Sequence, residues 1–387
     1  MKSLRKFLDK NKPLFQKGGK YEKFGSTFGA FETFLFTPDH TSRTGTHIHD
    51  TIDLKRTMIV VVLALLPVLL FGSWNIGYQH GLAFGIERGI MANFWFGFLK
   101  VLPIIVVSYG VGLGIEFIFA QIRGHEVNEG FLVTGLLIPL IVPVNIPLWM
   151  VALATAFAVV FGKEIFGGTG YNIVNVALLA RAFLFFAYPG HMTGDKVWIY
   201  QLTEKAPVDG FSGATPLAEC ALGNTEKIPS LGDMFMGYIP GSIGETSTLA
   251  ILIGAAILIW TGVGSWKIML STLLGALAIG GLCNLFPAND YMELAPWNHL
   301  LMGGFAFGMV FMATDPVTAT HTERGKWFYG FGIGAFAVMI RVFNPAYPEG
   351  MMLAILLMNI TAPLIDYFVV ESHIKRRLNR VHSKKNA

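Results

Sequence analysis

The sequence has little charge and almost no cysteine. Only 14% of its 387 residues are Asp, Glu, Lys or Arg, whereas 53% are hydrophobic and the mean hydropathy is +0.54. Soluble chains carry about 25% charged residues, so this composition indicates a membrane protein. The two cysteines, Cys220 and Cys283, cannot supply the four thiolates of a common iron–sulfur cluster, so any cluster would be shared with another chain. We expect no cleavable signal peptide, because the first apolar run begins only near Thr57.

Motifs that bind nucleotides or metals are also missing. The glycine run GGTGYNIVN (167–175) is not followed by Gly-Lys-Ser/Thr, so it is not a phosphate-binding loop. A Gly-x-Gly-x-Gly pattern at 109–116 lies in an apolar segment, where close packing of helices is the better explanation. The ten histidines show no spacing typical of metal ligands. The chain has no domain that could bind NADH, and we expect no nucleic-acid partner.

Ten apolar segments could cross a membrane, wholly or in part. A span needs roughly 20 mostly apolar residues. Prolines interrupt the stretch 130–162, which we divide into a short or broken third segment and a fourth that begins near Pro147. The ten segments are Thr57–Tyr78, Val101–Ala120, the two within Gly130–Gly162, Asn172–Ala187, Thr246–Gly262, Ile268–Phe286, His299–Ala313, Phe328–Ile340 and Met351–Val370. They predict an all-α polytopic membrane protein.

Two short pieces interrupted by Gly and Pro resemble each other, TGLLIPLIVPV (134–144) and GGFAFGMVFMATDPV (303–317). Each is the third segment in a group of five, so the chain is predicted to form two inverted five-helix halves with broken helices. Paired broken helices of this kind point to a polar site near the middle of the membrane. The expected divisions are a tail 1–56, a first half 57–188, a loop 189–245, a second half 246–370 and a basic tail 371–387.

Positive charge is concentrated in the two tails. Eleven Lys or Arg precede Thr57, and six follow Glu371. Lys and Arg mark the cytoplasmic side of a membrane protein, and an even number of spans places both tails on that side. The loop 189–245 follows five spans, so it is predicted to face outward.

This outer loop contains VDGFSGATPLAEC (208–220), an island of small residues with the hydroxyls of Ser212 and Thr215. Ser, Gly and Thr are common in turns, so an ordinary loop turn explains the stretch as well as any other interpretation of its composition. The alternative is a modification site. Small neighbours leave the Thr215 hydroxyl open to an enzyme, and that hydroxyl can form a phosphoester.

The stretch DGFSGATPLA (209–218) resembles the flavin-attachment motif of a known family. That family comprises NqrB, a membrane component of the sodium-pumping NADH:quinone oxidoreductase, and RnfD, its counterpart in the related Rnf complexes. The similarity extends to HDTIDLKR (49–56), RGHEVNEGFLVTG (123–135), GKEIFGGTGYNIVNVALLARAFLFFAYPG (162–190), MATDPVTA (312–319) and APLIDYFVVESHIKRR (362–377). The long tail before the first span favours the NqrB branch. The resemblance also implies a fold similar to that of urea transporters.

The resemblance gives Thr215 a task, because in this family the hydroxyl carries FMN through a phosphodiester installed by a flavin transferase. Three small residues of the motif, Ser212, Gly213 and Ala214, then belong to the recognition sequence. The family also implies a second, non-covalent flavin, riboflavin.

The asparagines of the glycine run, Asn172 and Asn175, together with Thr134, are our candidates for polar contacts to riboflavin. Their alternative role is to hydrogen-bond neighbouring helices. The family places quinone near the cytoplasmic end of the second span, which makes Gly112 a quinone candidate. The tail segment Phe31–Arg43 would help to cover that site.

Ionisable residues inside apolar segments are costly in lipid and are therefore functional candidates. Glu116, Glu164, Asp315 and Asp366 lie within or at the ends of such segments, and Arg181 lies inside the fifth. The alternative for each acid is a charge at a span end, solvated or paired with Lys or Arg. Asp315 precedes a proline in a broken segment, where a carboxylate and free carbonyls could bind Na⁺. The resemblance favours Glu116, Asp315 and Asp366 as residues of a sodium pathway.

Two functions follow as hypotheses. The first, from the resemblance, is a membrane subunit of the sodium-translocating NADH:ubiquinone reductase of the bacterial inner membrane. It would pass electrons from FMN through riboflavin to quinone and contribute to Na⁺ translocation, and it would be active only with the other subunits of the complex. The alternatives are an RnfD-type subunit of a ferredoxin:NAD⁺ oxidoreductase and a channel similar to urea transporters without a redox role.

Overall fold

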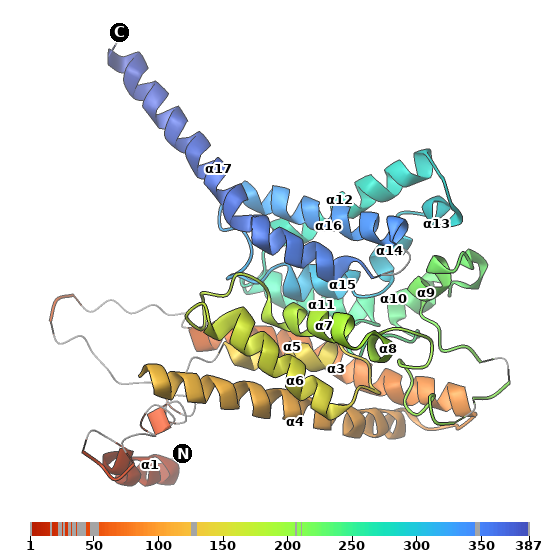
Figure 1. Ribbon diagram of the computed structural model, residues 1–387, viewed down its shortest axis with the longest axis horizontal. Coiled ribbons are helices and arrows are strands. Elements are labelled where there is room, and N and C mark those ends of the chain that lie inside the picture. The colour runs from red at the N-terminus through yellow and green to blue at the C-terminus, as the bar shows by residue number, and fades with distance from the viewer. Residues whose placement is uncertain are drawn as a thin grey trace.

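The protein is a bundle of helices. The computed structural model describes residues 2–15, a few positions between 18 and 46, and then 54–124, 130–205, 207–209, 211–344 and 349–385. Every regular element in these ranges is helical, and none is a strand. Figure 1 shows the long helices side by side, with both termini at the left end and helices α9 (Pro216–Ala221) and α13 (Asp290–Glu293) at the opposite end.

Helices cover each of the ten predicted segments. They are α3 (Leu54–Phe84), α4 (Ile90–Arg123), α5 (Phe131–Leu140), α6 (Leu148–Val159), α7 (Val176–Ala187), α11 (Thr248–Trp260), α12 (Trp266–Leu285), the series α14 (Asn298–Leu301), α15 (Phe305–Phe307) and η4 (Gly308–Met312), α16 (Gly325–Phe343) and α17 (Met351–Lys385). Among the described residues, α3, α4, α12, α16 and α17 are long and apolar enough to cross a membrane. The polytopic helical fold is confirmed, whereas the number ten and the likeness to urea transporters stay predictions.

The two broken segments have the form that their glycines and prolines predict. The helix α5 ends at Leu140, and the chain turns before Pro147 caps the start of α6. A π-helical turn, η2 (Val160–Glu164), then extends α6. The eighth segment is likewise divided into two short α-helices and the π-helical turn η4. Proline lacks an amide hydrogen, which agrees with the turn between α5 and α6, where Pro143 and Pro147 lie, whereas the eighth segment is divided at Gly303 and Gly304.

Two boundaries differ from the prediction. The second helix begins at Ile90, so Lys100 lies inside it and not before it. The Lys100 ammonium lies 4.4 Å from the centroid of the Tyr200 ring, and this cation–π contact gives the charge a partner in an apolar part of the helix. The last helix continues past Val370 to Lys385, so the basic tail is helical as far as the structure describes it.

The helices of 57–188 and 246–370 pack in matching ways. In the first set α4 contacts α6 and α6 contacts α7, and in the second α12 contacts α16 and α16 contacts α17. The leading helices α3 and α11 contact each other and join the two sets. Small residues allow the closest approach, since a Cβ on Gly334 would lie 1.9 Å from the carbonyl oxygen of Thr272. The division into two inverted halves stays a prediction.

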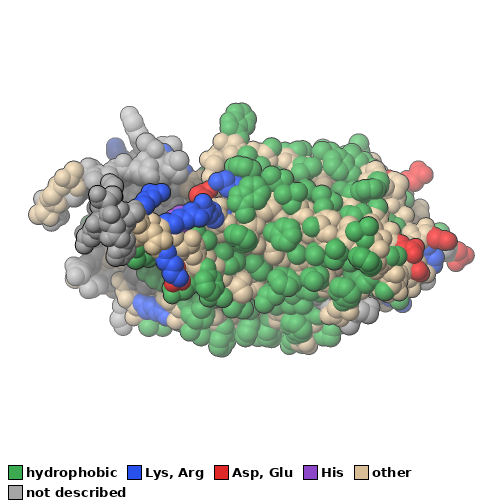
Figure 2. Space-filling model, turned by 90° about the horizontal axis from the view of Figure 1, so that it is seen from above, with side chains coloured by type: hydrophobic (Ala, Val, Ile, Leu, Met, Phe, Trp, Pro, Cys, Tyr) green, Lys and Arg blue, Asp and Glu red, His purple; other side chains and the backbone are tan. Residues whose placement is uncertain are grey.

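The surface carries a broad apolar band between two charged ends. Figure 2 shows hydrophobic side chains over the middle of the molecule, Lys and Arg at the left and Asp and Glu at the right. Many large apolar side chains are exposed in the structure, among them Trp260, which is 92% exposed. Lipid is the medium that makes such exposure favourable, so the surface agrees with a membrane protein.

Candidate functional site

The loop after α7 folds into short helices at the end of the bundle opposite the two termini, the end that the sequence predicts to face outward (Figure 1). These are α8 (Pro189–Met192), α9, the single turn η3 (Thr225–Lys227) and α10 (Leu231–Met236). Thr215 is the N-cap of α9, and its Oγ1 accepts a hydrogen bond from the amide of Ala218 at 3.2 Å. Pro216 occupies the first helical position, where no amide hydrogen is needed. Thr215 therefore starts a helix, which fixes the position of its hydroxyl oxygen.

The residues before Thr215 are held by packing and by a small turn. The hydroxyl of Ser212 accepts a hydrogen bond from the amide of Ala214 at 3.3 Å. Gly213 is buried, and a Cβ at that position would lie 2.2 Å from the carbonyl oxygen of Asp195 and 2.8 Å from the Leu202 side chain. Only glycine fits against this backbone, so Gly213 holds the motif on the segment that carries Asp195.

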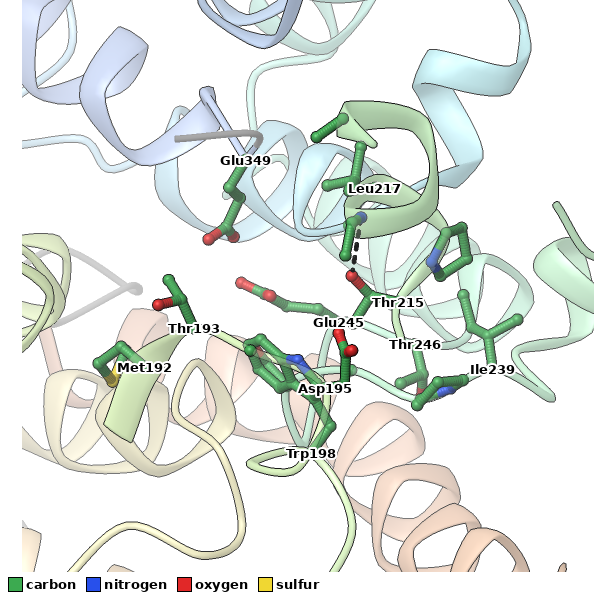
Figure 3. A pocket seen from close by; sticks show the side chains of 18 of the residues that line it. Met192, Thr193, Asp195, Trp198, Thr215, Leu217, Ile239, Glu245, Thr246 and Glu349 are labelled. Atoms are coloured by element: carbon green, nitrogen blue, oxygen red, sulfur yellow. Dashed lines mark hydrogen bonds between the residues drawn. The ribbon is translucent and has the colours of Figure 1, made fainter. Parts of the chain in front are cut away.

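The Thr215 side chain lines a cavity of about 310 Å³, which we call the outer cavity (Figure 3). Its walls include the apolar side chains of Met192, Trp198, Leu217 and Ile239. Ligand pockets span roughly 300–1,000 Å³ and combine apolar walls with a few polar groups. The outer cavity fits that description and is large enough for a planar aromatic ring system.

Buried charges form the floor of the outer cavity. Arg181 of α7 donates one hydrogen bond to Glu245, a second to Glu349 Oε2 at 2.5 Å and a third to Ser242 Oγ at 3.3 Å. The Arg181 side chain is only 4% exposed. Figure 3 shows the Glu245 and Glu349 carboxylates directed toward the cavity. We name Arg181, Glu245 and Glu349 the floor cluster. Of these three residues, the sequence indicated only Arg181, as a charge inside an apolar segment.

A second cavity, the inner cavity, collects all three candidates for riboflavin contacts. Thr134, Asn172 and Asn175 line it together with Asp315 and Lys163. Its volume is about 100 Å³. This is below the roughly 300 Å³ of pockets that enclose drug-sized ligands, so riboflavin does not fit the inner cavity at this size.

Asp315 is bound into a polar network beside the inner cavity. Its carboxylate accepts hydrogen bonds from Thr318 Oγ1 at 3.0 Å, the amide of Val317 at 3.1 Å and Asn175 Nδ2 at 3.4 Å. The Asn175 side chain also caps α7, and its backbone amide donates a hydrogen bond to Asn359 Oδ1 at 3.1 Å. The backbone amide of Asn175 thus joins α7 to α17, while its side chain caps α7 and bonds to Asp315, which is the structural role that we weighed against flavin binding.

The buried acids of the first half pair across helices. Glu116 of α4 forms an ion pair with Lys163, and both side chains are buried. Arg123 donates to the carbonyl oxygen of Glu164 at 2.7 Å, and its guanidinium lies 3.8 Å from the Glu164 carboxylate. Lys163 therefore pairs with Glu116 and not with its neighbour Glu164, because adjacent residues on a helix point in different directions.

The third sodium candidate lies apart from the other two. Asp366 accepts hydrogen bonds from the amides of His321 at 2.8 Å and Thr322 at 3.0 Å and from Thr322 Oγ1 at 2.5 Å. It lines neither the outer nor the inner cavity. Within the described part of the chain no three His, Cys, Asp or Glu side chains form a metal-binding group. The sodium pathway stays a prediction.

The quinone candidate has a packing role. A Cβ on Gly112 would lie 1.8 Å from the Phe131 ring, so glycine allows α4 and α5 to approach closely. This agrees with the packing explanation of the glycine pattern. Most of the tail segment Phe31–Arg43, which we expected near the quinone, falls outside the described residues.

The cysteines are two separate thiols. Cys220 and Cys283 are buried and unbonded to each other. The Cys220 sulfur lies 3.8 Å from the sulfur of Met302, on the side of α9 that faces the protein. Burial raises the pKa of the Cys220 thiol to about 12.

Known proteins extend these observations. The profile of the NQR2, RnfD, RnfE family matches residues 41–375. The chain belongs to this family. It is 49% identical to the NqrB component of the Na⁺-translocating NADH-quinone reductase of Stutzerimonas stutzeri, with 97% of this chain and 99% of the relative covered. Proteins of the same name are 48% identical in Pseudomonas aeruginosa, with 97% and 99% covered, and in Chromohalobacter salexigens, with 97% and 96% covered. The matched range includes Thr215 and the other residues that line the outer cavity.

Proposed function

We propose that this protein is the NqrB component of a sodium-translocating NADH:quinone reductase and that it carries FMN on Thr215. The relatives with that name match it over nearly their whole length. The observation that carries the proposal is the Thr215 hydroxyl on the wall of a cavity of about 310 Å³. The protein works with the other subunits, because we found no NADH-binding motif in its sequence.

The residues around Thr215 suit a covalently held flavin. Attachment replaces the hydroxyl proton of Thr215 with a phosphoryl group, while the same oxygen still accepts the hydrogen bond from Ala218. Trp198 and Leu217 supply apolar walls against which a flavin ring can pack. Bound FMN supplies the redox chemistry, and the protein positions it and sets its electrostatic surroundings.

We place the outer cavity on the periplasmic side of a bacterial inner membrane, with both termini in the cytoplasm. The basic tails and the acidic opposite end of the molecule support this orientation (Figure 2). Electrons then travel inward from the Thr215 flavin to quinone. Na⁺ moves outward along a path that includes Glu116 and Asp315, whose neighbourhood of polar side chains and broken helices supports such a role.

Fluorescence of the denatured subunit in a gel tests the covalent flavin. We expect a fluorescent band when the protein is produced with a flavin transferase, and none without the transferase. Thr215→Ala should abolish the fluorescence, because it removes the only side-chain hydroxyl at that position. Ser212→Ala keeps the Thr215 oxygen and should retain a fluorescent band. A dark wild-type band in the presence of the transferase would contradict the proposal.

The sodium path has its own test. We expect Asp315→Ala and Glu116→Ala to weaken the stimulation of quinone reduction by Na⁺ in the assembled complex. An unchanged sodium response in both variants would remove the two acids from the pathway.

A further inference from the structure

The Glu349 carboxylate lines the outer cavity, but the attachment of FMN to Thr215 does not require it. It lies directly before α17, and its Oε2 accepts a hydrogen bond from Arg181 at 2.5 Å. Figure 3 shows it on the opposite side of the cavity from Asp195, with its carboxylate directed inward. A ring held by Thr215 in this cavity would therefore lie next to an ionisable group.

The charges around Glu349 are unbalanced within the floor cluster. Among the described residues, Arg181 is the one guanidinium that bonds to the carboxylates of both Glu245 and Glu349. Arg341 of α16 is fully buried nearby, but its guanidinium donates to the carbonyl oxygens of Glu349, His299 and Met302 and not to a carboxylate. Asp195 faces the cavity from the loop and is exposed. One cation thus serves two carboxylates.

This arrangement places Glu349 near its point of titration. Burial raises the pKa of the Glu349 carboxyl to about 7, and Glu245 adds to the rise, while Arg181 and Arg341 oppose it. The carboxyl can therefore gain or lose a proton near neutral pH when a nearby charge changes.

Glu349 is also the member of the pair that water can reach more easily. Its side chain is 17% exposed, against 7% for Glu245. A group that exchanges protons with solvent needs such access, whereas Glu245 lies deeper.

We propose that Glu349 takes up one proton when an electron enters the flavin on Thr215, and releases it when the electron leaves. The proposal rests on the attachment of FMN at Thr215. The reductase activity supplies the electron, and water at the cavity mouth supplies the proton, which converts the Glu349 carboxylate into a carboxylic acid. No bond to the flavin forms or breaks. The added proton offsets the added negative charge, so the net charge of the cavity stays constant.

The reduction potential of the Thr215 flavin, titrated at several pH values around neutrality in the assembled complex, tests this proposal. Loading with flavin is first verified by fluorescence in a gel. The wild-type potential should fall as pH rises, because reduction is coupled to proton uptake. In Glu349→Gln the slope should decrease, by at most about 59 mV per pH unit for one proton and one electron. Asp195→Asn is the matched control, since it removes an exposed carboxylate from the same cavity and should keep the wild-type slope.

The outcomes separate the two proposals. A wild-type protein without fluorescence contradicts the attachment of FMN. A loaded Glu349→Gln complex with the wild-type slope overturns the role of Glu349. Infrared difference spectra of the wild-type complex give a second measurement that needs no variant. Reduction should produce a band of a protonated carboxyl that shifts when glutamate is labelled with ¹³C, and absence of that band also overturns the proposal.

Discussion

The outer and inner cavities use buried charge in different ways. The floor cluster lines the outer cavity of about 310 Å³, so a ligand bound in that cavity would lie next to its carboxylates. Around the inner cavity of about 100 Å³, Lys163 is paired with Glu116 and Asp315 is hydrogen-bonded by three donors. The charged side chains of the floor cluster line an open cavity, whereas Lys163, Glu116 and Asp315 are occupied by contacts with other protein groups. This difference suits a ligand site at the outer cavity and a structural network at the inner cavity.

The largest expected loss of stability comes from removing one cation at each of the two cavities. Lys163→Met removes the ammonium that contacts the buried Glu116 carboxylate, and breaking a buried pair costs about 3–5 kcal/mol. Arg181→Met leaves Glu245 and Glu349 on the wall of the larger outer cavity, where Glu349 is 17% exposed, so the loss should be smaller. Denaturation midpoints of the solubilised complex measure both.

The double variant Lys163→Met with Glu116→Gln provides the control for the inner pair. Removing both charges should recover most of the lost stability, because the penalty arises from the buried carboxylate that has lost its ammonium partner. Equal losses in Lys163→Met and Arg181→Met would contradict the distinction between the two cavities.

The second effect concerns the packing that holds Thr215 at the outer cavity. Gly213→Ala forces a Cβ against the carbonyl of Asp195, and overpacking of this kind costs about 1–3 kcal/mol. We expect the loop to shift and covalent flavin to decrease, although Thr215 is unchanged. Gly190→Ala is the matched control, because no atom lies within 4 Å of the added Cβ at that site in the same loop. Full flavin loading in Gly213→Ala would show that this contact does not position the motif.

Much of the fold was predictable because its causes are local. Apolar runs marked the helices, and the prolines near 139–147 and at 316 marked the broken ones. Lys100 misled the prediction, because a charge suggests the border of a span. Its contact with the Tyr200 ring depends on tertiary structure and leaves no local signal.

The site was predictable only in part, because most of its contacts join distant segments. The Thr215 motif is contiguous, and Thr134, Asn172 and Asn175 line one cavity, although their contact with riboflavin stays a prediction. The floor cluster joins Arg181 to residues 64 and 168 positions away, and a single sequence does not show such pairing. Lys163 likewise bonds to Glu116, 47 positions away, and not to the adjacent Glu164.

The third prediction compares two amides at the inner cavity. The Asn175 side chain caps α7 and donates to Asp315, so Asn175→Ala should cost about 1–2 kcal/mol, while the bond from its backbone amide to Asn359 is kept. Asn172 makes one long bond, 3.4 Å, to the carbonyl of Val174, so Asn172→Ala should change stability by less than about 0.5 kcal/mol. Thermal unfolding of the solubilised complex measures the pair, and similar losses would contradict a network centred on Asn175.

The smallest expected effect is the labelling of Cys220, which tests whether α9 stays packed against the protein next to Thr215. Cys220 lies on the protein-facing side of α9, where burial raises its thiol pKa to about 12. The reactive species is the thiolate, so Cys220 should remain unmodified by a maleimide at neutral pH in the folded complex. Ser212→Cys in a Cys220→Ala background should react readily, because residue 212 is exposed. Mass spectrometry of the labelled protein separates the two sites. Rapid labelling of Cys220 would mean that α9 detaches from the protein. Because residues of α9 line the outer cavity, the cavity would then open further than it does in the structure.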